Sequence, residues 1–135
     1  MQMKLNLIAR ILPVLLAVVL QVMPLVRNLF VNARLHGGDG AIRAEVRRIE
    51  GQAIIAVEDD GPGVPESERE RIFTPFYRLP GLRIPGDTGL GLGLALVRQV
   101  ARFHAGEVVY IARQPTGSRF EVRLPVNPST TLSTA

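Results

Sequence analysis

A carboxylate followed by two glycines stands where an apolar, strand-like stretch ends. Residues 53–57 are small or β-branched, and the chain continues as EDDGPGVP, which contains Asp59, Gly61 and Gly63. An ionised carboxylate only accepts hydrogen bonds, so it suits the amino group of adenine, whereas guanine presents an oxygen there. Glycines let a flat ring approach the backbone. The stretch indicates an adenine site; the alternative is an acidic turn, because Asp, Gly and Pro are ordinary turn residues.

A run of alternating glycines begins a later amphipathic pattern. The motif TGLGLGLALV contains Gly89, Gly91 and Gly93, with Leu92 before the last glycine. Uncovered backbone N–H groups at the positive end of a helix bind phosphate, which predicts a phosphate site here. A hinge for a lid and a close helix contact are the alternatives. The motif is neither the P-loop nor the dinucleotide-binding fingerprint.

Two asparagines, Asn28 and Asn32, lie four residues apart in a helical pattern and therefore share a face. An amide oxygen can bind Mg²⁺, which takes hard oxygen ligands from protein, phosphates and water. A solvated polar face is the simpler explanation of such a pair taken alone. The pair gains meaning only together with the other two motifs.

Periodicity and turn residues predict the elements that position these motifs. In chain order they are a helix from Pro24 to Gly37, a strand pair over 41–49 and 53–57 with a turn at Gly51–Gln52, a short helix over 66–72, an amphipathic helix from Leu92 to near Gly106, and a strand pair over 107–112 and 119–124.

Composition predicts one globular domain and limits its chemistry. The 135 residues are 47% hydrophobic and 21% charged, with a net charge of +4. Lys4 is the only lysine, and the arginines are scattered between acids, which argues against nucleic-acid binding. The absence of cysteine excludes disulfides and thiolate metal sites. His36 and His104 lie outside zinc-binding patterns and are interpreted as helix-end residues.

Residues 1–24 form an apolar segment that leaves three interpretations open. Ile11 to Leu20 is an unbroken apolar run that contains Pro13 and follows Lys4 and Arg10. Its length favours a packed helix or strand, while membrane association and a targeting peptide are the alternatives. At the other end, residues 126–135 are predicted to be a flexible tail.

In this order and spacing, four motifs resemble the N, G1, F and G2 boxes of the ATP-binding domains of histidine kinases, which are members of the GHKL ATPase superfamily. They are NLFVNA (28–33), EDDGPGVP (58–65), IFTPFYR (72–78) and TGLGLGLALV (88–97). The resemblance covers residues 25–125, and the F box favours two-component kinases over the chaperone, gyrase and mismatch-repair branches.

The resemblance implies a Bergerat-type α/β (α+β) two-layer sandwich, with helices on one face of a mixed, mostly antiparallel sheet. The segment before Leu25 does not resemble the usual start of such a domain, which leaves an incomplete sandwich open. A basic residue often stands three positions after the Mg²⁺-binding asparagine, but here that position is Leu35, with Arg34 before it. We therefore expect a weaker or rerouted phosphate contact.

The resemblance also implies a role for each motif residue. Asn32 would bind Mg²⁺, Asn28 would lie toward the phosphates, and Asp59 would take the adenine amino group. The other expected ATP contacts are Gly61 and Gly63 along the purine, Gly89, Gly91, Leu92 and Gly93 at the lid and triphosphate, and Arg78 at a phosphate. Phe73 and Phe76 are interpreted as anchors of the lid or, alternatively, as core residues.

Such domains use ATP and Mg²⁺ to phosphorylate a histidine on a separate dimerisation domain, and through that domain they act on a response regulator. They form the cytoplasmic part of a membrane-bound kinase. Neither His36 nor His104 precedes the acid and proline typical of an acceptor histidine, so the chain is expected to bind ATP without phosphorylating itself. The alternative function is that of a truncated, non-catalytic nucleotide-binding remnant acting through a partner protein. A serine kinase of the anti-sigma type shares the fold, but the F box argues against it.

Overall fold

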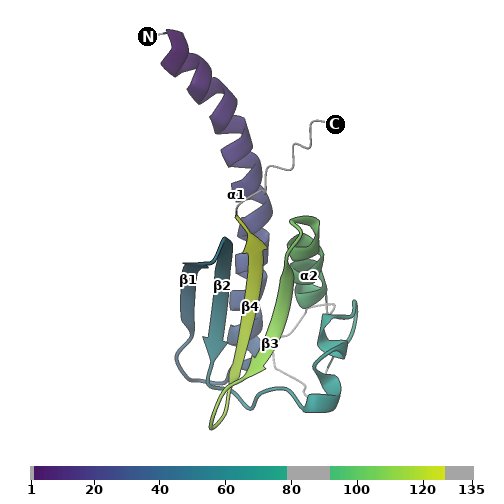
Figure 1. Ribbon diagram of the computed structural model, residues 1–135. Coiled ribbons are helices and arrows are strands. Elements are labelled where there is room, and N and C mark those ends of the chain that lie inside the picture. The colour runs from purple at the N-terminus through teal and green to yellow at the C-terminus, as the bar shows by residue number, and fades with distance from the viewer. Residues whose placement is uncertain (1, 79–91, 127–135) are drawn as a thin grey trace.

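In the part of the chain that the structure describes, two α-helices and a four-stranded sheet form two layers. The computed structural model describes residues 2–78 and 92–126. In chain order, its elements are α1 (Gln2–His36), β1 (Arg43–Ile49), β2 (Gln52–Asp59), the 3₁₀ turns η1 (Glu66–Glu68) and η2 (Arg71–Phe73), α2 (Gly93–Phe103), β3 (Glu107–Ala112) and β4 (Ser118–Pro125). Figure 1 shows α2 and the C-terminal half of α1 behind one face of the sheet, while the N-terminal half of α1 projects beyond it.

The sheet has the strand order β1-β2-β4-β3, and its three pairs are antiparallel. The two-residue turn between β1 and β2 has positive φ at both positions, 47° at Glu50 and 77° at Gly51, which matches the twist of a tight hairpin. Gln52, predicted as part of the turn, is the first residue of β2 and pairs with Ile49. Within the described residues, the predicted two-layer sandwich with helices on one face of a mostly antiparallel sheet is confirmed, and the sheet is antiparallel throughout rather than mixed.

The core lies between the helices and the sheet. On α1, Leu25, Leu29 and Ala33 recur every four residues, and on α2, Val97 and Ala101 do the same. The remaining buried members of this core are Val57, Ile72, Phe73, Val108, Phe120 and Val122. Because each helix buries a stripe along one side, its other side stays available for contacts outside the core.

Helix α1 begins at Gln2, so the prediction that it starts at Pro24 is wrong. The helix continues through Pro13 and Pro24. Proline removes one hydrogen bond of the helix and crowds the preceding turn, but the turns on both sides can persist. The favoured interpretation of residues 1–24 as a packed segment also fails, because the side chains of residues 2–21 are exposed.

The short helix predicted over 66–72 is instead two single 3₁₀ turns, η1 and η2. The segment available between Pro65 and Thr74 is short, and α-helix nucleation is costly in so few residues. Single 3₁₀ turns are common as connectors of this kind.

The end of α1 meets the loop after β2 at a contact that only glycines allow. A Cβ atom on Gly61 would lie 2.6 Å from the carbonyl oxygen of His36 and 2.8 Å from the Cα atom of Gly37. A Cβ atom on Gly37 would lie 2.6 Å from the Cβ atom of Asp59. These distances are shorter than real Cβ contacts, so the two backbones could not approach this closely with side chains in place.

We expect Gly61→Ala to lower the free energy of unfolding by about 1–3 kcal/mol, because the backbones of α1 and the loop must separate. Gly93→Ala is the matched control, since its Cβ atom would be 3.9 Å from the nearest atom, in the side chain of Asn28. Urea denaturation followed by circular dichroism measures both variants. Equal stability of Gly61→Ala and the native chain would contradict the close contact.

Candidate nucleotide-binding site

Asp59 is a buried carboxylate at the end of β2, with 3% of its surface exposed. Side chains alternate along a strand, so Asp59 shares the helix-covered face with Val57, while Glu58 points to the opposite face. Its Oδ1 atom accepts a hydrogen bond from the backbone N–H of Gly61 at 2.9 Å. This local bond is typical of an aspartate that turns the chain, and it fixes the carboxylate at the strand end.

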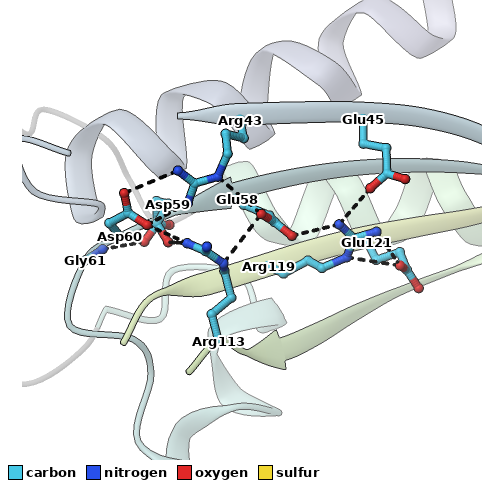
Figure 2. A network of polar contacts seen from close by, with 9 residues as sticks. All are labelled: Arg43, Glu45, Glu58, Asp59, Asp60, Gly61, Arg113, Arg119 and Glu121. Carbon is cyan, nitrogen blue, oxygen red and sulfur yellow. Dashed lines mark hydrogen bonds and ion pairs between the residues drawn. The ribbon is translucent and has the colours of Figure 1, made fainter. Parts of the chain in front are cut away.

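The neighbouring carboxylates are held by arginines (Figure 2). Arg43 and Arg113 each donate a hydrogen bond of 2.6 Å to Oδ1 of Asp60. Arg113 also donates to the carbonyl oxygen of Asp59 at 2.8 Å, and Arg119 donates to Glu58 at 2.9 Å. These guanidinium groups bind the strand end from the face opposite the helices, and they are engaged with carboxylates rather than available for phosphate.

The arginines also lower the pKa of both carboxyl groups. Hydrogen bonds from Arg43 and then Arg113 lower the pKa of Asp60 from 3.8 to about 2. The hydrogen bond from Arg119 lowers the pKa of Glu58, although burial acts in the opposite direction. At neutral pH, Glu58 and Asp60 are therefore ionised, and the positive charges of the arginines balance their negative charges.

Asn28 and Asn32 are half-buried on α1, beside its core-facing stripe. A Cβ atom added to Gly93 would lie 3.9 Å from Oδ1 of Asn28, so this side chain is next to the first residue of α2. Leu92, the half-buried residue before α2, makes no side-chain hydrogen bond that caps the N-terminus of this helix. The structure therefore places an amide beside the positive end of a helix that its described N-cap residue leaves without a side-chain cap.

Helix α1 connects the two ends of the candidate site. Its C-terminal end lies against Asp59 and Gly61, and Asn28 lies beside α2. At the rise of an α-helix, the stretch from Asn28 to Gly37 is about 14 Å long, with Asn32 between them. This arrangement separates a carboxylate suited to a base from amides and a helix end suited to phosphates.

Four further residues are predicted ATP contacts: Gly63, Arg78, Gly89 and Gly91. Gly89 and Gly91 are outside the described residues. Gly63, with φ of 77°, faces β3, because an added Cβ would be 3.3 Å from the hydroxyl of Tyr110. That hydroxyl accepts a hydrogen bond from the N–H of Val64 at 2.9 Å, which ties the loop to β3. Arg78 is exposed at the end of the first described range.

The two aromatic residues of the F-box motif have different environments. Phe73 is buried and packs edge-to-face on Phe120, with ring centroids 6.3 Å apart, so the core interpretation is correct for this residue. Phe76 is 69% exposed and has φ of 65°, so it does not belong to the core.

Three residues that the sequence analysis did not assign support the site. Gly37, interpreted only as a helix stop, packs against Asp59. Tyr110 on β3 and Arg113 in the hairpin turn after β3 form hydrogen bonds with the backbone of the G1 motif. Of these residues, only Gly37 had a signal in the local sequence, because it stands at the end of a predicted helix. The contacts of Arg113 and Tyr110 join segments about 50 positions apart in sequence, so no local pattern could indicate them.

A helix-covered antiparallel sheet, with a carboxylate at one strand end and an asparagine pair on the covering helix, defines an ATPase-type α/β sandwich. The chain belongs to the family of histidine kinase-, DNA gyrase B- and HSP90-like ATPases, whose sequence profile matches residues 17–128. The resemblance to histidine-kinase catalytic domains is thereby confirmed.

Named relatives are sensor kinases. The signal transduction histidine-protein kinase AfsQ2 of Streptomyces coelicolor is 38% identical over 102 residues, which are 76% of this chain and 19% of AfsQ2. The chain therefore spans about a fifth of that relative. The solved mycobacterial sensor histidine kinase MprB is 32% identical, with a TM-score of 0.68 over 78% of this chain and 72% of that one. The catalytic domain of the histidine kinase ThkA is 27% identical, with a TM-score of 0.66 over 80% of this chain and 69% of that one.

The ion pairs of Asp60 predict how stability changes in acid. Its pKa is lower in the folded chain than the ordinary 3.8, so these pairs stabilise the fold above about pH 4, and this stabilisation is lost as pH falls toward 2. We expect Asp60→Asn to have a lower Tm than the native chain at neutral pH and to approach it near pH 2. The control is Asp39→Asn, at an exposed aspartate. A Tm difference that is constant with pH would contradict this role of Asp60.

Proposed function

We propose that the domain binds ATP with Mg²⁺ and donates the γ-phosphoryl group to a histidine of a separate dimerisation domain. Through that domain it acts on a response regulator. The observation that carries the proposal is the buried carboxylate of Asp59, packed against the same helix that presents Asn28 and Asn32. One solved relative supports nucleotide binding: full-length ShkA, in complex with AMPPNP, is 27% identical, with a TM-score of 0.67 over 78% of this chain and 21% of that one.

The adenine would bind at the end of β2. Oδ1 of Asp59 already accepts the Gly61 N–H, which leaves Oδ2 to accept a hydrogen bond from the exocyclic amino group. Gly61 is a predicted purine contact through its backbone, because the end of α1 already fills the space that a Cβ atom of Gly61 would need. Guanine would place a carbonyl oxygen against the carboxylate, and the repulsion would exclude it.

The phosphates would lie between α1 and the start of α2. Asn28 and Asn32 present amide oxygens suited to Mg²⁺, with Asn32 as the proposed ligand, and the N–H groups after Leu92 and Gly93 carry the positive end of α2. When bound, Mg²⁺ neutralises charge on the phosphate oxygens. Gly89 and Gly91 remain predicted lid residues, Gly63 a predicted purine contact and Arg78 a predicted phosphate contact.

In the proposed reaction, an imidazole nitrogen of the acceptor histidine attacks the γ-phosphorus, the bond to the bridging oxygen breaks, and ADP leaves. The domain contributes positioning and charge neutralisation, and it needs no nucleophile of its own. His36 ends α1 and His104 follows α2, as predicted for helix-end residues. Because the reaction consumes ATP, we place the domain in the cytoplasm.

Calorimetric titration with a non-hydrolysable ATP analogue, with and without Mg²⁺, tests the binding step, with GTP as the control. We expect Mg²⁺-dependent binding of the ATP analogue and no binding of GTP. Transfer of labelled γ-phosphate from ATP to an added acceptor domain of a sensor kinase then tests catalysis. Binding without transfer to any of several acceptor domains would favour the non-catalytic remnant, and a folded chain that binds neither nucleotide would refute the proposal.

Asp59→Asn separates the adenine contact from the fold. An asparagine can still accept the Gly61 N–H, but it turns an NH₂ donor toward the amino group of adenine. Because a hydrogen bond to a charged group contributes about 1.5–3 kcal/mol, we expect roughly 10- to 150-fold weaker binding of the ATP analogue. Asp39→Asn, at an exposed aspartate, is the control and should bind normally. Unchanged affinity of Asp59→Asn would contradict the adenine assignment.

A further inference from the structure

The N-terminal half of α1 exposes a large apolar surface. Thirteen large apolar side chains between Met3 and Met23 are 44–85% exposed. The helix contains an 18-residue window with a mean hydropathy of 2.2, and none of that window is buried. Figure 1 shows this half of α1 standing free of the sheet. Exposure of such a surface to water is strongly unfavourable in free energy, so we expect an apolar binding partner to cover it.

The shape of the apolar surface indicates what covers it. At 3.6 residues per turn, Asn6, Arg10 and Gln21 fall on one side, and large apolar side chains occupy roughly two thirds of the circumference. A helix that packs on a protein surface needs a narrower stripe, as α2 has with Val97 and Ala101. Lipid chains surround a helix and therefore match the wide surface better than a protein groove does.

We propose that residues 5–23 of α1 are embedded in a lipid bilayer. Nineteen residues of α-helix are about 28 Å long, close to the thickness of the hydrocarbon layer, which is about 30 Å. Lys4 lies just outside the segment at one end and Arg27 at the other. Arg10 is about 8 Å from the Leu5 end, a distance over which an arginine side chain can extend to the headgroups.

Embedding this segment would place the candidate site near the membrane surface. Helix α1 continues without a break from Met23 to Asn28, a distance of about 8 Å along its axis. A partner domain would then have to reach the site close to the lipid headgroups. The membrane proposal rests on the exposed surface alone and is independent of phosphoryl transfer.

The chain has no cysteine, so single cysteines can report lipid burial directly. Leu16→Cys, at a position 57% exposed on α1, is compared with Val46→Cys, at a position 76% exposed on β1. The full chain is reconstituted in phosphatidylcholine–phosphatidylglycerol vesicles and treated with a membrane-impermeant maleimide, with rates normalised to the unfolded chains. We expect labelling at position 16 to be at least about 10-fold slower than at position 46. Equal labelling would overturn the proposal.

A second pair of variants tests the lipid contact without labelling. Leu15→Lys combined with Val19→Lys places two charges on the apolar face, and Val46→Lys combined with Ile49→Lys adds the same charges to β1. The first pair should bind sedimenting vesicles at least about 100-fold more weakly, and the second should bind like the native chain. Unchanged binding of the first pair would contradict the proposal. A lipid-free oligomer that does not bind vesicles and protects position 16 would instead assign the surface to a second copy of the chain.

Discussion

The contact between the end of α1 and the loop after β2 is the constraint on which the candidate site depends. Gly37 and Gly61 meet backbone to backbone, and Asp59 lies directly against Gly37. The stripe that begins with Leu25 fixes the same helix on the sheet further along its length. With α1 fixed at two places, Asn28 is held at a set distance from the carboxylate of Asp59.

The alternation of β2 places three consecutive carboxylates in two environments. Glu58 and Asp60 are paired with arginines on the outer side, while Asp59 lies on the helix side and is stabilised by a backbone N–H. The network in Figure 2 also supports the site through the backbone, because Arg113 donates a hydrogen bond to the carbonyl oxygen of Asp59.

The sequence was informative where structure depends on local pattern. Both hairpins and the amphipathic helix could be predicted because their turns and periodicity are short-range, and the assignment of the four boxes rests on contiguous motifs. The Gly37–Gly61 contact and the arginine network could not, because strand pairing brings Arg43 and Arg119 to Glu58 from far along the chain. The start of α1 was mispredicted because Pro24 is a common first residue of a helix, yet here it lies inside one.

Pro24 lies where the free half of α1 meets the core. Proline removes a hydrogen bond and crowds the carbonyl four residues earlier, so the turn from Leu20 to Pro24, like the turn that ends at Pro13, lacks one hydrogen bond of the helix. Leu25 follows at once and is fully packed, so the core begins immediately after this turn. Bending there would move the apolar half while Asn28 and Asn32 stay fixed to the sheet.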